Sequence, residues 1–307
     1  MEDKLDTLLT NLPPYKCLSA YHGLKMKIEG KFPEVPIEFF CREVRGVEVY
    51  MTAALRTDQP SILILESTKI DFEAENEEFF PLFENCKRTF PSIFDRFMFI
   101  AVRGIIQHAF FAYLKLQSFE YDTRVNPMEC FYMSFAQQRK IQSVELSLPE
   151  GYRFDKADPG KDAEIITNTW IHSGPSGLEQ TKLKLKYCPS VVVRKGDDPV
   201  GFEMSTCFGT QNHLWVFEEH RMKGIGKAIE MKLAQECIRI GNIPFKFVEL
   251  SNEKVSERAN KDPIWTRKSD SSGKPLTVDF VHFYPEEDGK PKCPKETNFS
   301  KISKKEN

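Results

Sequence analysis

The sequence lacks the long uncharged apolar run that a membrane-spanning helix needs, which is about 18 residues. Its most apolar stretch, residues 97–116, is interrupted by Arg103 and His108. It also lacks an excess of charge of either sign, since 43 Lys and Arg face 45 Asp and Glu for a net charge of -2. This balance excludes a general electrostatic attraction to nucleic acid, although it allows a local basic patch. We therefore predict that neither a membrane nor nucleic acid is a partner.

Cysteine spacing of the zinc-binding kind is absent as well. The eight cysteines form no CxxC pair, and no cluster of Cys and His has the spacing of a zinc site, so we predict no metal. We expect most of the cysteines to be small buried apolar side chains. The acidic N-terminus, residues 1–9, has neither the apolar core of a signal peptide nor the Arg-rich composition of a mitochondrial transit peptide. These features favour a reducing compartment such as the cytoplasm.

What is present is an ordinary globular composition, with 40 % hydrophobic and 29 % charged residues in a chain of 307. At roughly 150 residues per domain, this length predicts two domains or one large one. Pro and Gly interrupt the pattern at 148–151, where we place the boundary. This division gives domains at 1–150 and 151–285, followed by a polar, Lys-rich tail at 286–307 that we expect to be frayed.

Strand and helix patterns alternate in both halves, which is typical of an α/β fold. In the first half we predict strands at 47–53, 61–66, 97–103 and 130–135, a helix at 73–86 that Pro81 bends or divides, and a helix ending at 117. In the second half we predict helices at 161–170, 178–187, 225–240 and 252–260, and strands at 190–194, 200–206, 213–217 and 245–250. Segments 264–267 and 277–283 have the pattern of a hairpin around 271–273.

The most informative segment is the turn at 221–227, which reads R-M-K-G-I-G-K between a strand and a helix. The backbone N–H groups of 222–226 are expected to converge at the helix N-terminus, and glycines would let a phosphate approach them closely. The glycine spacing matches neither a Walker loop nor a dinucleotide fingerprint. The alternative is that Gly224 and Gly226 only make a tight turn.

The order of elements around this turn resembles that of the GNAT superfamily of acyl-CoA-dependent N-acyltransferases, in which such a turn holds the CoA pyrophosphate. Three segments resemble the glycine N-acyltransferase family: 168–174 (N-T-W-I-H-S-G), 220–225 (H-R-M-K-G-I) and 245–253 (F-K-F-V-E-L-S-N-E). The resemblance is good over about 160–262 and thinner over about 10–150. It implies a GNAT-like acyltransferase fold built from two tandem GNAT-like halves, of which the N-terminal one is degenerate.

The resemblance also implies how acyl-CoA is held. The strands at 213–217 and 245–250 are expected to splay, so that the pantetheine arm pairs with the backbone of the first strand. A bulge N–H near 214–217 would then donate to the oxyanion. Asn252 either bonds the pantetheine or caps the helix that follows it. The residues assigned to acyl-CoA are Val216, Phe217, Arg221, Met222, Lys223, Gly224, Ile225, Gly226, Lys227 and Asn252.

The general base departs from the family pattern. Family members resemble one another in using a glutamate on the strand before the turn, and Thr210 stands at that position. The candidate bases are His213, whose imidazole titrates near neutral pH, and Glu203, a carboxyl on a central strand. His213 could instead be structural, and Glu203 could point to solvent. Many GNAT proteins also place a tyrosine as the acid where this chain has Asn260.

Trp170 and His172 precede a Ser/Gly/Pro-rich segment at 173–177. In the resembling fold this helix-loop-helix borders the site of the acceptor amine, and its composition suits a mobile lid. The alternative is an ordinary loop with Trp170 in the core.

The sequence thus predicts an acyl-CoA-dependent N-acyltransferase that acylates the amine of glycine or another small amino acid. Its co-substrate would be acyl-CoA, and its partner a small-molecule amine. The alternative is a catalytically inactive GNAT-fold protein that binds acyl-CoA or a protein partner. The departures at Thr210 and Asn260 favour that alternative, and the intact turn at 221–227 favours retained CoA binding. By resemblance to the vertebrate family members, a mitochondrial location stands beside the cytoplasmic one.

Overall fold

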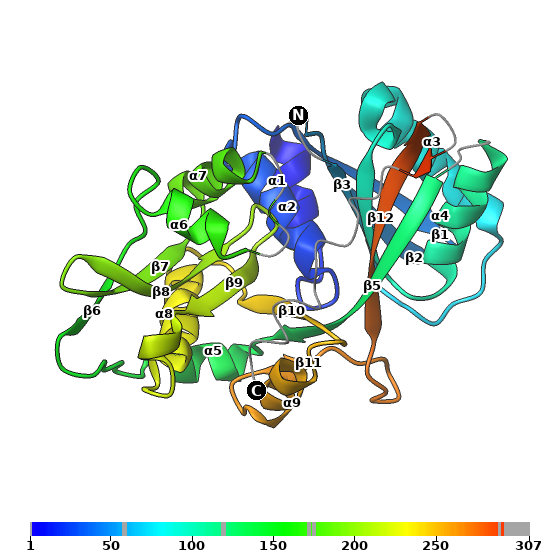
Figure 1. Ribbon diagram of the computed structural model, residues 1–307. Helices are drawn as coiled ribbons and strands as arrows, with labels where there is room; N and C mark the ends of the chain where they lie inside the picture. The colour runs from blue at the N-terminus through cyan, green and yellow to red at the C-terminus, as the bar shows by residue number, and fades with distance from the viewer. Residues whose placement is uncertain are drawn as a thin grey trace.

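The computed structural model describes residues 2–56, 60–117, 121–170, 173, 176–287 and 290–291. Figure 1 shows two halves side by side, with the long strand β5 running between them. The helices are α1 (Glu2–Asn11), α2 (Leu18–Ile28), α3 (Phe80–Thr89), α4 (Ile105–Leu116), α5 (Phe135–Gln142), α6 (Ala163–Asn168), α7 (Gly177–Tyr187), α8 (Ile225–Arg239) and α9 (Glu253–Lys261). Three short 3-10 turns are η1 (Asn76–Phe79), η2 (Pro91–Phe94) and η3 (Glu218–His220).

The first-half strands are β1 (Ile37–Val44), β2 (Val47–Ala54), β3 (Ser61–Ser67), β4 (Phe97–Val102) and β5 (Tyr121–Tyr132). The later strands are β6 (Tyr152–Asp155), β7 (Ser190–Lys195), β8 (Asp198–Ser205), β9 (Thr210–Val216), β10 (Phe245–Glu249), β11 (Thr266–Arg267), β12 (Thr277–Glu287) and β13 (Lys290–Pro291). One sheet passes through both halves in the order β1-β2-β3-β4-β12-β5-β10-β9-β8-β7-β6.

The two halves exchange strands. β12, from the end of the chain, pairs with β4 and β5 and so completes the sheet of the first half. The end of β5, from the first half, pairs with β10 in the second half. Each half holds one parallel pair, β3 with β4 and β9 with β10, whose strands are connected through a helical segment. This repeated arrangement is what two tandem halves require. The boundary at 148–151 stays a prediction, because a single sheet crosses it.

Helices cover both faces of the second-half sheet. One core lies between that sheet and α6 and α7, and it contains Ile166, Leu185 and Phe202. Another lies on the opposite face, where Ile225, Ile229 and Leu233 of α8 pack against the strands. Successive strand residues point to opposite faces, so each strand next to α8 presents one set of side chains to α8 and the other to α6 and α7.

Phenylalanines fill the first-half core. Phe97 and Phe283 stack at 4.4 Å between ring centroids, and Phe99 and Phe110 stack at 4.1 Å. Phe283 belongs to β12, so a residue near the end of the chain packs inside the core of the first half. The abundance of phenylalanine thus reflects buried packing in a core that residues 40–114 build together with β12.

Most sequence-predicted elements are present with small shifts in their ends. Pro81 divides the predicted helix at 73–86 into η1 and α3, where it occupies the first turn. The predicted strand at 130–135 is wrong at both ends, since β5 begins at Tyr121 and α5 begins at Phe135. Pro127 and the polar residues before it hide the strand, because proline is rare inside sheets.

The predicted hairpin around 271–273 is confirmed at its turn but is wrong for its two strand segments, 264–267 and 277–283. β11 pairs with β5, and β12 pairs with β4 and β5, so the two segments do not pair with each other. A short antiparallel turn around 271–273 is present: a bridge joins Ser269 to Pro275, and the N–H groups of Asp270 and Leu276 donate to the carbonyls of Lys274 and Lys268. Local alternation identified the segments as extended, but their partners lie more than a hundred residues away in the sequence.

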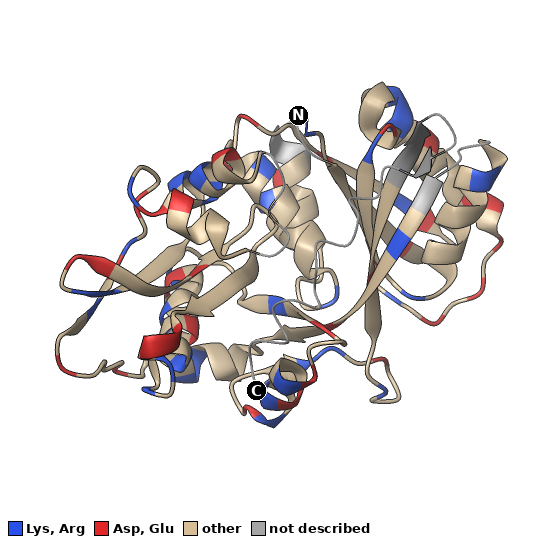
Figure 2. Ribbon diagram, in the orientation of Figure 1, with Lys and Arg blue, Asp and Glu red and all other residues tan. Residues whose placement is uncertain are grey.

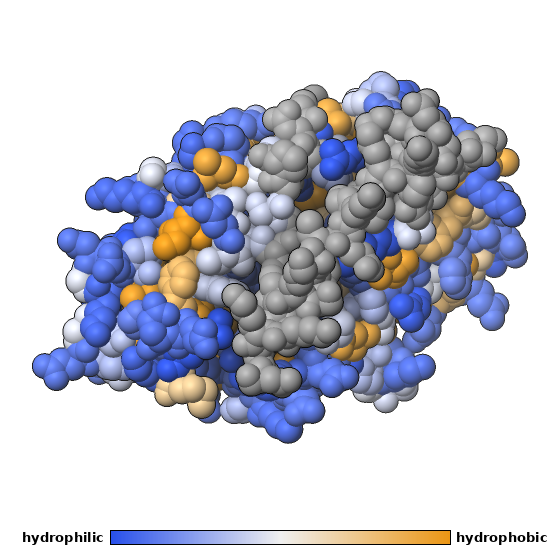
Figure 3. Space-filling model, in the orientation of Figure 1, coloured by the Kyte–Doolittle hydropathy of each residue, from blue (hydrophilic) through white to orange (hydrophobic). Residues whose placement is uncertain are grey.

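The surface and the cysteines fit the compositional expectations. Five of the seven described cysteines are buried, and all seven are free thiols. Among the described residues no helix is long and apolar enough to cross a membrane. Both charge signs are distributed over both halves (Figure 2), and hydrophilic residues cover most of the face in Figure 3, where the apolar residues form separate patches.

Candidate active site

β9 and β10 separate beside the turn at 221–227. They run parallel and pair only at Thr210 with Phe245 and at Gln211 with Lys246. Beyond these pairs β9 stays paired with β8 and β10 stays paired with β5, so the two strands diverge (Figure 1). Among the described residues, the backbone edge of β9 beyond Gln211 therefore has no strand partner on the β10 side, and an extended ligand could pair there.

A β-bulge lies at this opening. Phe202 pairs with Trp215 and Met204 pairs with Asn212, so the single residue Glu203 faces two residues of β9. His213 has a φ of 62°, in the left-handed region. A bulge re-aims the local N–H groups. It includes Leu214 but begins at His213, one residue before the predicted range of 214–217.

The side chain of His213 lies among residues from the end of α6. Its Nε2 is 3.1 Å from the Thr169 hydroxyl, and its ring lies 4.9 Å from that of Trp170. The Phe202 ring, at 5.3 Å, closes another side. The structure thus brings together two residues that the sequence predicted for one site, His213 and Trp170. The other predicted acceptor-site residue, His172, lies outside the described residues.

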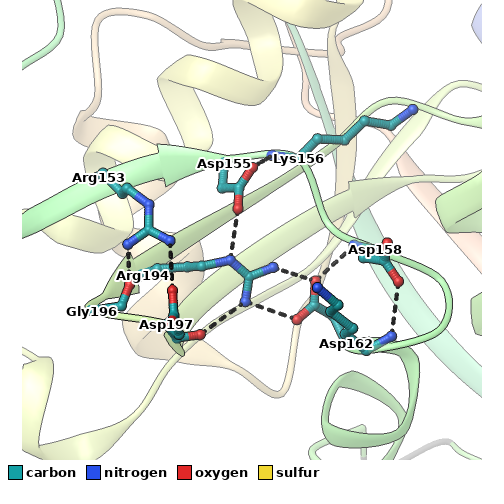
Figure 4. Close-up of polar contacts among 9 residues, drawn as sticks. Arg153, Asp155, Lys156, Asp158, Asp162, Arg194, Gly196 and Asp197 are labelled. Atoms are coloured by element: carbon teal, nitrogen blue, oxygen red, sulfur yellow. Dashed lines mark hydrogen bonds and ion pairs between the residues drawn. The ribbon is translucent and has the colours of Figure 1, made fainter.

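A buried arginine holds α6 in place (Figure 4). The Arg194 guanidinium on β7 contacts Asp162, just before α6, at 2.7 Å, and Asp155 on β6 at 2.8 Å. The Arg194 and Asp162 side chains are 8 % and 2 % exposed. The guanidinium holds the pKa of the Asp155 carboxyl below its usual value, mainly through the hydrogen bond between them. Because Trp170 follows α6 directly, this network helps to position it against His213.

We expect Arg194→Met to lower the free energy of unfolding by about 3–5 kcal/mol, because Asp162 would be left as an unpaired buried charge. Urea unfolding measures the change. Arg153→Met is the matched control: its pair with Asp197 is 50 % and 104 % exposed, and we expect its loss to cost about 0–1 kcal/mol. Equal effects of the two variants would contradict the structural role of Arg194.

The turn at 221–227 adopts two left-handed conformations before α8, at Met222 (φ 59°) and Gly224 (φ 78°). Arg221 donates from Nε to the Val216 carbonyl at 2.9 Å, and Lys223 donates to the Glu219 carbonyl at 2.8 Å. These bonds tie both cations to the turn. Lys227 forms an ion pair with Asp262, which follows α9. The cationic groups that were predicted to surround an anion are therefore gathered at the N-terminus of α8, where first-turn N–H groups lack intrahelical acceptors.

The backbone conformation of the turn requires glycine at one of its two glycine positions and not at the other. Gly224 needs its positive φ, which L side chains rarely adopt. Gly226 has no such conformation, and a Cβ there would only reach Val216 Cγ2 at 3.6 Å, an ordinary contact. Glycine inside a helix costs roughly 0.5–1 kcal/mol relative to alanine. Packing therefore does not explain Gly226, whereas the close approach of a ligand would.

Three of the other predicted CoA residues lie on β9, just after it and at the start of α8, whereas Asn252 lies after β10. Val216 ends β9, and the Phe217 N–H donates to the Val200 carbonyl at 3.0 Å. Ile225 is the first residue of α8 and is buried. Asn252 is the N-cap of α9, where its Oδ1 accepts from the Val255 N–H at 3.4 Å. The capping interpretation of Asn252 is confirmed, and a contact with pantetheine stays a prediction.

Glu203 is a buried carboxyl on the face of the sheet opposite His213. It is 4 % exposed, and its Oε2 has no hydrogen-bond partner among the described residues. Burial raises the pKa of Glu203 well above its usual range, and the nearby Glu230 carboxylate raises it further, against the opposing charge of Lys246. The solvent-facing interpretation of Glu203 is wrong. Its role as a base stays a prediction.

The raised pKa of Glu203 has a consequence for stability. As the pH rises above the ordinary glutamate pKa of 4.5, the unfolded chain ionises this carboxyl while the folded protein keeps it protonated, so stability falls with a limiting slope of about 1.4 kcal/mol per pH unit. We expect Glu203→Gln to remove this part of the pH dependence and to gain stability relative to the wild type as pH rises. Chemical denaturation between pH 4.5 and 8 tests it, with exposed Glu145→Gln as the control. Parallel pH profiles for wild type and Glu203→Gln would contradict the assignment.

Thr210 and Asn260, which depart from the pattern of the resembling family, both lie among the described residues. Thr210 is the first residue of β9 and is 9 % exposed. The Asn260 amide donates to the Ser256 carbonyl at 2.9 Å and to Glu129 Oε2 at 3.4 Å. Sequence reasoning also missed Lys184, whose ammonium lies 4.2 Å from the centroid of the Trp170 ring. Three lysines alternate along α7, and no sequence pattern distinguishes the one that meets Trp170.

No protein-family model matches the sequence, and no curated protein matches it. Among solved structures, an X-ray structure of a Drosophila protein is similar over 94% of this chain and 98% of its own, with a TM-score of 0.68 and 12% identity. A GCN5-related N-acetyltransferase from Kribbella flavida is similar over 88% of this chain and 96% of its own, with a TM-score of 0.49 and 12% identity.

A tandem GNAT protein from the clavulanic acid biosynthesis pathway is similar over 87% of this chain and 89% of its own, with a TM-score of 0.49 and 8% identity. Likeness at these identities concerns the fold alone. The chain has a mixed α/β, GNAT-like fold, as its splayed parallel strands, its bulge and its strand–turn–helix at 210–239 require. The described residues contain no group of three or more His, Cys, Asp or Glu side chains that could hold a metal ion.

Proposed function

We propose that this protein is an acyl-CoA-dependent N-acyltransferase whose acceptor is the amine of glycine or another small amino acid. The observation that carries the proposal is the divergence of β9 and β10 after two residue pairs, beside the bulge at His213. This geometry leaves one backbone edge for an extended thioester arm. The turn at 221–227 lies at the end of β9, where the pyrophosphate of the same molecule would lie.

The chemistry follows from this placement. The attacking amine nitrogen forms a bond to the thioester carbonyl carbon, and the C–S bond breaks to release the CoA thiolate, which then takes up the proton that His213 has accepted. A bulge N–H stabilises the developing oxyanion. His213 takes the proton that the amine loses, and Thr169 orients the imidazole through the contact to Nε2. Holding both substrates side by side supplies a further part of the acceleration.

One specific observation favours a second candidate, a GNAT-fold protein that binds acyl-CoA without turnover. Thr210 and Asn260 stand where the resembling enzymes carry a glutamate and a tyrosine, and Asn260 is engaged in structural hydrogen bonds. Under this candidate the cleft and the turn keep their ligand, and His213 serves only in packing.

Both candidate functions require binding of CoA or acyl-CoA, which calorimetric titration with CoA, acetyl-CoA and benzoyl-CoA tests. We expect micromolar binding, because the turn and the free strand edge both contact the ligand. A coupled assay of thiol release with glycine and other amines then separates the enzyme from the binding protein. If neither CoA nor either of the two thioesters binds, both candidate functions are wrong.

A further inference from the structure

Lys184 is a cation beside the candidate active site with no carboxylate partner among the described residues. It lies on α7, where lysines recur along the helix (Figure 2). Its neighbours on that helix are paired: Lys182 contacts Glu179 at 2.8 Å and Lys186 contacts Glu34 at 3.3 Å. The Lys184 ammonium instead lies 4.2 Å above the Trp170 ring. A partly buried ammonium without an anion is costly, so the site favours a negatively charged occupant.

A second cation increases this preference. Arg56 follows β2 in the first half of the chain, yet it lies close enough to Lys184 to affect its titration. Burial, and then the charge of Arg56, lower the pKa of Lys184 to about 8. Burial and the charge of Arg96 lower the pKa of Arg56 to about 10. Both halves of the molecule therefore contribute positive charge to the same place.

The thiols nearby do not supply the missing negative charge. Burial raises the pKa of Cys207 to about 11, even though Arg56 and Lys184 both favour its thiolate. Burial also raises the pKa of Cys188 well above its usual value. Both side chains are therefore neutral thiols near pH 7, and neither supplies a negative charge to Lys184.

The position of Lys184 connects this charge to the acyl-transfer site. The Trp170 ring contacts both groups, since its centroid is 4.2 Å from the Lys184 ammonium and 4.9 Å from that of the His213 ring. His213 belongs to the bulge that faces the opening between β9 and β10. Lys184 and the proposed base thus contact the same indole ring. A small molecule with an amine and an acid group close together could reach both.

We propose that Lys184 binds the carboxylate of the acceptor, so that the acceptor is an amino acid and not a polyamine or an uncharged amine. The inference rests on the proposed function and makes Lys184 a positioning and specificity residue for it. A cationic acceptor would meet like charge from Lys184 and Arg56, whereas a carboxylate would complete a charge-assisted hydrogen bond. Cation–π contact with Trp170 holds the ammonium in place before the acceptor arrives.

The kinetic test compares glycine with glycinamide, which keeps the amine and lacks the carboxylate. We expect the wild type to prefer glycine, and Lys184→Met to raise KM for glycine about 10- to 100-fold with little change for glycinamide. Lys184→Arg keeps the charge and is expected to recover part of the loss. Lys182→Met, on the same helix, is the control and is expected to leave both acceptors unaffected.

Two kinetic outcomes would overturn the assignment. Equal use of glycine and glycinamide by the wild type would show that no carboxylate is recognised. A loss of kcat for both acceptors in Lys184→Met, without recovery in Lys184→Arg, would make Lys184 a proton acceptor and not a carboxylate site.

If no amine is acylated, the proposed function is wrong, but a binding measurement still tests the inference about Lys184. Glycine is titrated in the presence of CoA while tryptophan fluorescence is followed, and Trp170→Phe identifies the part of the signal that comes from Trp170. We expect a saturable change with glycine that glycinamide does not produce and that Lys184→Met abolishes. No change with glycine, or the same change in Lys184→Met, would overturn the inference even if CoA binds.

Discussion

Replacing Gly226 with glutamate should weaken CoA binding at least about 100-fold, which is about 2.7 kcal/mol, without unfolding the protein. The new side chain would project from the first turn of α8 beside the N–H groups at 222–226. Its carboxylate would compete with the pyrophosphate for those donors and repel it. Calorimetric titration of the variant with CoA measures the loss.

The structure indicates why this variant should stay folded. A Cβ at Gly226 meets Val216 Cγ2 at 3.6 Å, an ordinary contact, and the backbone there needs no positive φ. An acidic residue in the first turn of a helix is itself favourable, by typically 0.3–1 kcal/mol. Gln142→Glu, on the exposed end of α5, adds the same charge elsewhere and serves as the control. Unchanged CoA affinity in a folded Gly226→Glu protein would exclude the turn as the anion site.

The elements that carry the proposed CoA site were readable from the sequence because their signals are local. Ile225, Ile229, Leu233 and Cys237 repeat with helical spacing and form the buried face of α8. Asn252 is a strong N-cap residue and caps α9. The turn between β9 and α8 was identified by its glycines, one of which does adopt the left-handed conformation.

The strand exchange between the halves was not readable in this way. β5 contains a proline and few apolar residues in its first part, and its place depends on β12, which lies more than 140 residues further along the chain. Pairing over such a separation is decided by what each strand buries in the finished sheet. The same holds for the candidate active site, where Lys184, Trp170 and His213 come from three separate segments of the chain and meet only after folding.

Charged residues inside the molecule were the least predictable part. Glu203 has the same chemistry as an exposed glutamate, and only its position under α8 raises its pKa. Arg194 and Asp162 form a buried pair that positions α6, although nothing in the sequence separates them from the surface charges around them. In this protein, patterning indicates which face of an element is apolar, but burial of single charges depends on tertiary packing.

Replacing His213 with asparagine should lower kcat about 100-fold while leaving CoA affinity unchanged, because positioned acid–base groups contribute about 100- to 10,000-fold. Asparagine is the appropriate substitute, since His213 has a φ of 62° and asparagine tolerates this conformation better than alanine. The bulge and its N–H groups would then remain in place. Steady-state kinetics, together with CoA titration of the same protein, separates the proton transfer from binding.

A pH profile makes the assignment of His213 specific. A histidine base gives kcat/KM an acidic limb in the neutral range, because only the neutral imidazole accepts a proton. We expect this limb in the wild type and in His108→Asn, a control at an exposed position on α4, and its loss in His213→Asn. A His213→Asn rate within a few-fold of the wild type would remove the imidazole from the reaction. The bulge N–H and the pairing of β9 with the thioester arm would then have to supply the catalysis, and the incoming amine would have to arrive already neutral.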